Sequence, residues 1–281
     1  MNTVKAALAA ARGKLPAGEA RLLLGHVMER PAAWLIAHDD EVLEEDALLC
    51  FASLVARRKG GEPVAYLVGY REFYGRDFAV SPEVLIPRPE TEMLVDIALG
   101  KEVGAGGTAT GAIKNAPRIL DLGTGSGCIA ITLALEIRAA QVSAVDASDA
   151  ALLVARKNAN RLDASLRLLR SDWFGGLSGE RFDLIVANPP YIAAEDTHLA
   201  AGDLRHEPRM ALAGGADGLD AIRRIVAAAP RHLSPGGQLW LEHGYDQADA
   251  VRKLLAAAGL CDIEQHRDVA GIVRVSGGRL P

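Results

Sequence analysis

Apolar residues recur at helical spacing through the first part of the chain, up to about Gly69. Segments rich in Ala, Leu and Glu are interrupted at Pro16, at Pro31 and at the Gly60-Gly61 pair, and the alternation of apolar and polar residues that marks a strand is not convincing in them. This pattern predicts a small N-terminal α-helical bundle over residues 1–70.

A connector of different character follows at residues 71–90. Two short apolar or aromatic runs, Phe73 to Val80 and Val84 to Ile86, are separated by Ser81-Pro82, and this arrangement predicts a β-hairpin. Proline is favourable in the first turn of a helix because an N–H there would have no partner, so Pro89 predicts the start of the next helix.

Short β-forming runs alternate with helical segments in the rest of the chain, after a glycine-rich stretch at 100–117 that predicts a flexible surface loop. The predicted strands are RILDL, QVSAV, LRLLR, FDLIVA, GQLWLE and GIVRVS, and helices are expected from about Ser126, Ser148, Leu219 and Gln247. Strands that alternate with helices imply βαβ units and a mostly parallel sheet covered on both faces. Residues 91–281 are therefore predicted to form an α/β domain whose ligands bind at the carboxyl ends of the strands.

The composition is that of a globular protein whose affinity does not come from covering a nucleic-acid backbone. The 281 residues include 31 Lys and Arg against 36 Asp and Glu, a net charge of -5. Cys50, Cys128 and Cys261 are far apart and odd in number, which predicts neither a disulfide framework nor a zinc cluster and favours a reducing cytoplasm. His206 and His243 lack metal-ligand spacing, so no metal site is expected. Charged residues interrupt the alanine-rich N-terminus, which predicts neither a signal peptide nor a membrane span.

A glycine-rich turn follows the first predicted strand of the α/β domain and opens a helix. Its members are Gly123, Thr124, Gly125, Ser126 and Gly127. The glycines permit a tight turn and a close approach of the backbone to a ligand, beside the free N–H groups of the helix start. The G-x-G-x-G spacing lacks the glycine that a dinucleotide fingerprint would need at Cys128, and the Gly-Lys-Ser/Thr ending of a P-loop is missing as well. A pyrophosphate cradle is therefore disfavoured.

Two further strand ends carry groups that suit a nucleoside. Asp146 ends the strand QVSAV, where a carboxylate can accept hydrogen bonds from ribose hydroxyls; the alternative is a helix cap, although Ser148 can cap that helix by itself. At the next strand end, Asp172 can accept from an exocyclic amine while Trp173 packs on a base; the alternative is a buried Trp beside a capping Asp. The three strand ends together predict an adenosine-shaped site, which S-adenosylmethionine fits.

The strand FDLIVA ends in Asn188, Pro189, Pro190 and Tyr191. The prolines remove two N–H donors and fix φ, so that carbonyls of the turn can face a ligand, and Tyr191 offers a flat wall with a polar tip. An amide or aromatic amino nitrogen is a poor nucleophile because its lone pair is delocalised. The Asn188 side-chain oxygen and the Pro189 carbonyl can bind its two hydrogens and position it for attack on a methyl sulfonium. The alternative is a turn with an Asn cap.

Three motifs resemble one known family. GTGSG (Gly123 to Gly127), NPPY (Asn188 to Tyr191) and IPRPETE (Ile86 to Glu92) look like the protein-(glutamine-N5) methyltransferases of the HemK/PrmC type, which modify peptide chain release factors. The resemblance extends over essentially the whole chain. It implies an α/β class I S-adenosylmethionine-dependent methyltransferase, Rossmann-like with a seven-stranded mostly parallel sheet. An N-terminal helical bundle that recognises the release factor and a β-hairpin connector would precede it.

The resemblance also implies roles for individual residues. The backbone at Gly123 to Gly127 would surround the methionine part of S-adenosylmethionine. Asp146 would hold the ribose, and Trp173 and Asp172 would contact the adenine. Asn188 would touch both cofactor and substrate, with Pro189, Pro190 and Tyr191 completing a slot for the glutamine. That glutamine would be the one in the Gly-Gly-Gln loop of the release factor, and S-adenosylhomocysteine would be the second product.

Other functions share part of this pattern. NPPY also occurs in enzymes that methylate the N6 amino group of adenine in nucleic acids, and related enzymes modify a glutamine of a ribosomal protein. A docking protein with a vestigial cofactor pocket is a third, non-catalytic alternative. The release-factor hypothesis implies a cytoplasmic enzyme, expected to be a monomer, with no membrane attachment and no direct nucleic-acid substrate.

Overall fold

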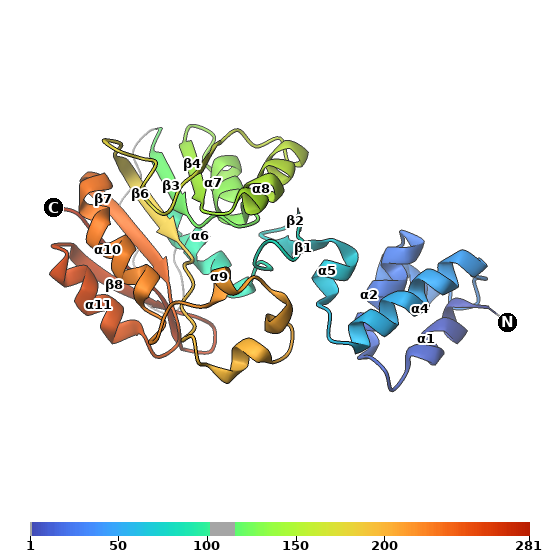
Figure 1. Cartoon of the computed structure of the whole chain (residues 1–281). Coiled ribbons are helices and arrows are strands. Elements are labelled where there is room, and N and C mark those ends of the chain that lie inside the picture. Colours follow the sequence, from blue (N-terminus) through green and yellow to red (C-terminus); the bar gives the residue numbers. More distant parts are fainter. Residues whose placement is uncertain (1, 102–115) are drawn as a thin grey trace. The chain divides into compact units, whose positions relative to one another are not determined.

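The computed structural model describes residues 2–101 and 116–281. Most of the glycine-rich loop predicted at 100–117 therefore lies outside the described residues. The chain divides into two compact units (Figure 1). One is Met1–Tyr70 together with Ala201–His206, and the other is Arg71–Ala200 together with Glu207–Pro281.

The first unit is built from helices. They are α1 (Val4–Ala11), α2 (Ala17–Met28), α3 (Ala32–Ala37), α4 (Glu45–Lys59) and α5 (Val64–Val68). The Thr3 side chain caps α1 by accepting from the N–H of Ala6, and prolines immediately precede α2, α3 and α5. Leu23, Leu24 and Leu35 are buried at the centre of its apolar core. The helical character predicted for this part of the chain is confirmed.

A short segment from the second half of the sequence, Ala201–His206, belongs to the helical unit. The Arg58 guanidinium donates to the Asp203 carboxylate at 2.7 Å, and Arg205 donates to the carbonyl oxygen of Gly60 at 2.6 Å. The hydropathy pattern does not predict this association, because it depends on polar contacts between residues far apart in the sequence.

The connector is a two-stranded hairpin of β1 (Tyr70–Phe73) and β2 (Arg76–Ala79). Its turn lies at Tyr74 and Gly75, which both have positive φ, of 56° and 73°. Two consecutive residues with positive φ match the right-handed twist of a hairpin. The prediction that Ser81-Pro82 separates the two strands is therefore wrong, and it failed because Tyr at a left-handed position carries no recognisable turn signal.

The second unit contains a seven-stranded sheet in the order β5-β4-β3-β6-β7-β9-β8. Its strands are β3 (Arg118–Leu122), β4 (Gln141–Asp146), β5 (Arg167–Arg170), β6 (Phe182–Ala187), β7 (Leu233–Glu242), β8 (Cys261–Arg267) and β9 (Val273–Arg279). Strands β3 to β7 pair in parallel, whereas β9 is antiparallel to both β7 and β8. The predicted mostly parallel seven-stranded sheet is confirmed, and β8, whose polar sequence CDIEQHR did not predict a strand, forms one edge.

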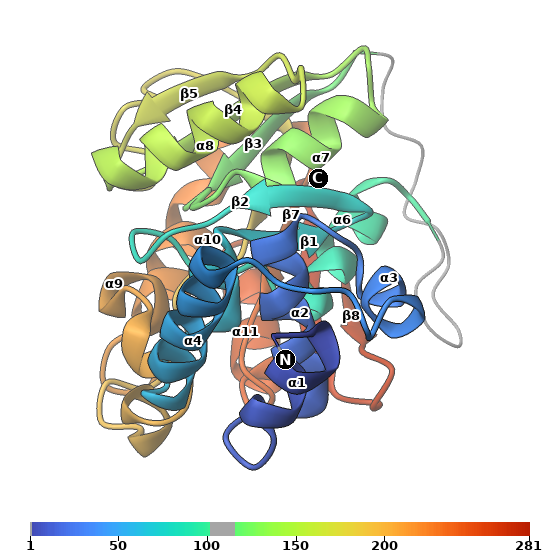
Figure 2. The same cartoon turned by 90° about the vertical axis from the view of Figure 1, so that its right-hand side faces the viewer.

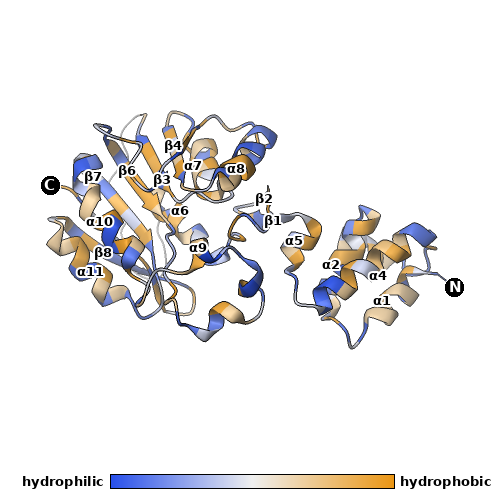
Figure 3. Ribbon diagram, viewed as in Figure 1, coloured by the Kyte–Doolittle hydropathy of each residue, from blue (hydrophilic) through white to orange (hydrophobic). Residues whose placement is uncertain are grey.

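Helices cover both faces of this sheet (Figure 2). On one face lie α6 (Glu92–Ala98), α7 (Cys128–Glu136) and α8 (Asp149–Arg161), and on the other α10 (Asp220–His232) and α11 (Ala248–Ala257). Side chains of β6 alternate between them, since Leu184 and Val186 pack with the first set and Ile185 and Ala187 with the second. The central strands are accordingly hydrophobic along their length (Figure 3). Short turns complete the unit: η1 (Pro89–Thr91), η2 (Thr197–Ala200) and α9 (Arg209–Leu212), while η3 (Leu204–His206) lies in the helical unit.

Asn158 is buried in α8 and connects the hairpin to the glycine-rich turn. Its Oδ1 accepts from the N–H of Ala79 at 2.8 Å, and its Nδ2 donates to the carbonyl oxygens of Ala79 at 3.0 Å and Ser126 at 2.8 Å. Because each buried group left unpaired costs about 1–3 kcal/mol, Asn158→Leu is expected to lower the free energy of unfolding by about 3–5 kcal/mol in urea denaturation. Asn160→Ala, at an exposed position of the same helix, should change it by less than about 0.5 kcal/mol. Similar changes in the two variants would contradict this role.

Candidate active site

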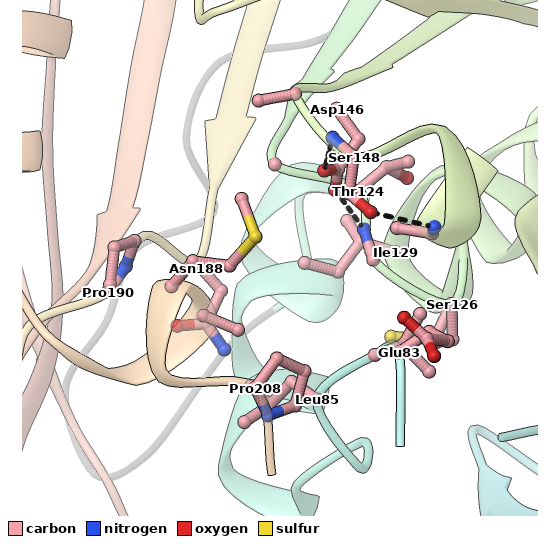
Figure 4. A pocket seen from close by; sticks show the side chains of 18 of the residues that line it. Glu83, Leu85, Thr124, Ser126, Ile129, Asp146, Ser148, Asn188, Pro190 and Pro208 are labelled. Atoms are coloured by element: carbon pink, nitrogen blue, oxygen red, sulfur yellow. Dashed lines mark hydrogen bonds between the residues drawn. The ribbon is translucent and has the colours of Figure 1, made fainter. Parts of the chain in front are cut away.

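A cavity of about 260 Å³ lies at the carboxyl ends of the central parallel strands (Figure 4). The turn after β3 contributes Gly123, Thr124, Gly125 and Ser126 to its wall. The ends of the neighbouring strands contribute Asp146, Asp172, Trp173, Asn188 and Pro190. The structure thus gathers these predicted residues around one space, whereas Gly127, Pro189 and Tyr191 do not line it.

The Asp146 carboxylate holds the glycine-rich turn and the start of α8. One of its oxygens accepts from the N–H of Gly125 and the other from the N–H of Ser148, both at 2.9 Å. The Ser148 hydroxyl itself caps the helix by accepting from the N–H of Ala151 at 3.2 Å. Asp146 therefore supports the start of α8, as the alternative of a helix cap predicted. Each of its oxygens still has a lone pair for a ligand in the cavity.

Gly127 serves the packing of helices rather than the cavity. It precedes α7 with φ +83°, and a Cβ at this position would lie 2.8 Å from Cδ1 of Ile131 and 3.2 Å from Cβ of Ala155. The glycine therefore permits the close approach of α7 and α8. Gly127 is predicted to lie beside the cofactor, but it does not line the cavity.

The turn after β5 presents an aromatic ring to the cavity. Trp173 has a positive φ of 51°, and its ring lies 3.4 Å from where a Cβ of Gly123 would be. The Ser171 hydroxyl stabilises this conformation by donating to the carbonyl oxygen of Trp173 at 2.7 Å. Asp172 is exposed and accepts from the Arg224 guanidinium at 2.6 Å, so part of its capacity to accept from an adenine is already used.

Asn188 lies on the cavity wall and is hydrogen-bonded to a buried polar pair that the sequence did not point to. Its Nδ2 donates to Oγ1 of Thr91 at 3.0 Å, and the Thr91 hydroxyl donates to the Glu242 carboxyl group at 2.7 Å. Tyr191 donates its hydroxyl to the other oxygen of Glu242 at 3.2 Å, which turns it away from the cavity. Burial raises the pKa of Glu242 to about 7, and burial together with Glu242 raises that of Tyr191. In the sequence, the signal that could have identified Glu242 is its position at the end of a core strand.

The backbone of the NPPY turn packs against a glycine-rich segment after α9. A Cβ on Gly214 would lie 2.5 Å from the Pro190 carbonyl oxygen, and one on Gly218 would lie 2.2 Å from that of Tyr191. The Tyr191 carbonyl also accepts from Nε2 of Gln247 at 2.9 Å. The carbonyls of Pro190 and Tyr191 are therefore directed to the protein itself.

A buried carboxylate joins two segments of the cavity wall that are distant in sequence. Glu207 accepts from the N–H of Ile86 at 2.9 Å and from the Arg88 guanidinium. Arg88 and the neighbouring Pro208 both line the cavity. Sequence reasoning did not identify Glu207, because only tertiary structure brings it beside the IPRPETE motif.

Asp121 and Cys128 are buried close to the glycine-rich turn. The Thr124 hydroxyl donates to the Asp121 carboxyl group at 2.6 Å, yet burial raises the pKa of Asp121 to about 7. Burial also raises the pKa of the Cys128 thiol to about 12, as expected of a cysteine that packs as a small apolar residue. In residues 2–101 and 116–281, His, Cys, Asp and Glu side chains form no group of three or more that could hold a metal ion.

The chain matches two protein families in different segments. The Methyltransferase small domain matches residues 110–215, and the PrmC N-terminal domain matches residues 1–69. A solved methyltransferase structure from Pyrococcus furiosus is similar in fold, with a TM-score of 0.55 and 18% sequence identity over 81% of this chain and 98% of that one. The sheet order and the cavity at the strand ends, together with these matches, define a class I methyltransferase.

Curated relatives narrow this class to one family. The Release factor glutamine methyltransferase of Bordetella pertussis is 53% identical over 95% of this chain and 96% of its own length. That of Burkholderia pseudomallei is 50% identical over 100% of both chains. The chain belongs to the release factor glutamine methyltransferase family. The relatives favour this interpretation over the alternatives of nucleic-acid or ribosomal-protein methylation. Within the described residues, no helix has the length and apolar character required to cross a membrane.

Proposed function

We propose that this chain transfers a methyl group from S-adenosylmethionine to the side-chain amide nitrogen, N5, of the glutamine in the Gly-Gly-Gln loop of peptide chain release factors. The observation that carries the proposal is the position of Asn188. It follows β6 and lies on the wall of the same cavity as Asp146 and the glycine-rich turn. A side-chain oxygen that can accept a hydrogen bond from a substrate amide thus lies beside a site suited to a nucleoside.

The lining of the cavity fits S-adenosylmethionine. Asp146 can accept from ribose hydroxyls, the Trp173 ring offers a flat surface for the adenine, and the turn at Gly123 lets the backbone approach closely. The arginines on the wall, Arg88 and Arg224, are each paired with a carboxylate, so their charge is compensated and does not favour a pyrophosphate.

The residues around Asn188 can orient a glutamine amide. S-adenosylmethionine, when bound, supplies a methyl group made electrophilic by its sulfonium. The Asn188 side-chain oxygen and the Pro189 carbonyl accept the two amide hydrogens and direct the nitrogen lone pair at that methyl group. The carbonyls of Pro190 and Tyr191 are directed to the protein itself, which leaves the Pro189 carbonyl as the second acceptor for the glutamine slot, although Pro189 is not part of the cavity lining. As the N–C bond forms, the bond between that methyl group and sulfur would break and S-adenosylhomocysteine would leave. The nitrogen would then lose one proton to water, so the protein need not supply a strong base.

Asp146 is expected to contribute to cofactor affinity. An amide at this position offers one acceptor oxygen where the carboxylate offers two, so it cannot accept from Gly125, Ser148 and a ribose as the carboxylate does. Asp146→Asn is therefore expected to weaken S-adenosylmethionine binding by about 10- to 100-fold in isothermal titration calorimetry. Asp149→Asn is the matched control and should change affinity by less than about 3-fold, because Asp149 does not line the cavity and its ion pair with Arg170 is exposed. Unchanged affinity in Asp146→Asn would exclude this role.

The proposed reaction is tested with purified chain, labelled S-adenosylmethionine and unmodified release factor. One methyl group is expected on the glutamine of the Gly-Gly-Gln loop, located by mass spectrometry of the digested release factor. The release factor with Gln→Ala in that loop should remain unlabelled. A ribosomal protein extract and a duplex nucleic acid serve as alternative acceptors, and label that appears in either of these but not in the release factor would refute the proposal.

We further propose that the chain works in the cytoplasm as a monomer and that residues 1–70 recognise the release factor. Apolar side chains are exposed on the helical unit at Ile36, Val42 and Leu49, whose exposed fractions are 67%, 70% and 64%. Exposed apolar side chains such as these offer surface that a protein partner can bury. Size-exclusion chromatography with light scattering, in the absence and presence of release factor, measures both the oligomeric state and the complex.

A further inference from the structure

A chain of hydrogen bonds leads from the cavity wall to a buried carboxyl group. Asn188 Nδ2 donates to Thr91 Oγ1, and Thr91 donates to one oxygen of Glu242 while Tyr191 donates to the other. Thr91 and Glu242 are each only 2% exposed, so water competes little for these groups. Of the four residues, Thr91 and Asn188 line the cavity.

The chemistry of the last group in this chain sets the direction of every bond in it. An ionised carboxylate only accepts hydrogen bonds, so Thr91 must donate its single proton to Glu242. The Thr91 oxygen is then available to Asn188 only as an acceptor. The amide of Asn188 must therefore turn its NH₂ group toward Thr91, and this leaves Oδ1 as the polar atom for the cavity.

We propose that Glu242, acting through Thr91, fixes the orientation of the Asn188 amide so that its oxygen, and not its NH₂ group, meets the substrate nitrogen. The inference rests on the proposed function, in which Oδ1 accepts a hydrogen from the glutamine amide. A flipped Asn188 would present a donor to another donor and repel that amide. Thr91 and Glu242 are thus positioning residues, which touch neither the donor methyl group nor the acceptor nitrogen.

Protonation of Glu242 removes this preference. A neutral carboxyl group donates one hydrogen, and when it donates to Thr91 the Thr91 proton is free to turn toward Asn188 and to favour the flipped amide. Burial raises the pKa of Glu242 to about 7; Glu90 raises it further, whereas the hydrogen bonds from Thr91 and Tyr191 and the charge of Arg274 lower it. The fraction of Glu242 that is ionised increases as the pH rises, so kcat is expected to increase through about pH 7 and then to level off.

Paired variants of Thr91 separate orientation from packing. Thr91→Val keeps the shape but lacks the hydroxyl, and it is expected to lower kcat by at least about 10-fold, while the KM for release factor and the affinity for S-adenosylmethionine change less than about 2-fold. Thr91→Ser keeps the hydroxyl and should retain kcat to within about 3-fold. Thermal melting confirms that each variant is folded. A Thr91→Val enzyme as fast as Thr91→Ser would overturn the proposal.

A spectroscopic measurement tests the orientation without any turnover. In protein with ¹⁵N-labelled asparagine, the side-chain NH₂ signals of Asn188, assigned by their loss in Asn188→Ala, are expected to shift with pH around a midpoint near 7. Glu242→Gln, whose amide does not ionise in this range, should remove that shift and flatten the pH dependence of kcat. NH₂ signals that do not respond to pH in the unmodified chain would contradict the inference. Absence of methyl transfer by the unmodified chain would instead refute the proposed function and leave this measurement to decide the orientation.

Discussion

Replacing Asn188 by alanine is expected to slow methyl transfer to the release factor by about 100- to 1,000-fold, the usual effect of removing one preorganised polar contact from an active site. The reason is that Oδ1 holds one of the two hydrogens of the glutamine amide, and without it the nitrogen lone pair is not directed at the methyl group. Single-turnover rates at saturating S-adenosylmethionine measure the loss on the chemical step.

Two controls belong with this variant. The thermal midpoint of Asn188→Ala should stay close to that of the unmodified chain, because the turn is also held by the contacts of Gly214 and Gly218. Saturating S-adenosylmethionine keeps any change in cofactor affinity out of the measured rate, since Asn188 also lines the cavity. Asn188→Asp retains an acceptor oxygen but cannot donate to Thr91, and it places a second carboxyl group close to Glu242. It should therefore also be slow, with an altered pH dependence. Turnover by Asn188→Ala within about 2-fold of the unmodified chain would exclude the assigned role.

Local patterns were sufficient to predict the strand ends at which Asp146 and Asn188 stand. Each follows an apolar run of strand length, and the glycine-rich turn between β3 and α7 is recognisable by itself. The parallel sheet then requires these ends to meet at one edge, so the arrangement of the cavity follows from the order of strands and helices.

The buried residues that hold the cavity wall in place by hydrogen bonds could not be predicted from local patterns. Thr91 and Glu242 are hydrogen-bonded although 151 positions apart, and Glu207 reaches Ile86 from 121 positions away. The residues around Glu207 do not distinguish it from an exposed carboxylate, and for Glu242 the one signal is its position at the end of a core strand, because burial is a property of the folded chain. The edge strand β8 was missed for a related reason: its polar residues alternate too weakly to stand out, and pairing with β9 makes it a strand.

Gly218→Ala is expected both to destabilise the chain and to disturb the NPPY turn, Asn188 to Tyr191. Gly218 is buried with φ +75°, and a Cβ there would lie 2.2 Å from the Tyr191 carbonyl oxygen and 2.6 Å from Nε2 of Gln247. The left-handed conformation costs an alanine about 1–2 kcal/mol, and overpacking adds about 1–3 kcal/mol, so the free energy of unfolding should fall by about 2–5 kcal/mol. The Tyr191 carbonyl must move to make room, and with it the turn that carries Asn188.

Gly179→Ala separates the contact from the backbone conformation. Gly179 has nearly the same φ, +74°, but a Cβ on it would meet nothing within 4 Å, so only the conformational cost of about 1–2 kcal/mol is expected. Urea denaturation compares the two variants, and kcat is measured at a temperature where both are folded. Gly218→Ala should lose at least about 10-fold in kcat and Gly179→Ala less than about 2-fold. A methyl group at Gly218 would contact the Tyr191 carbonyl, whereas one at Gly179 would contact nothing. If the two variants lose stability and kcat equally, the packing of Gly218 against Tyr191 does not hold the NPPY turn in place.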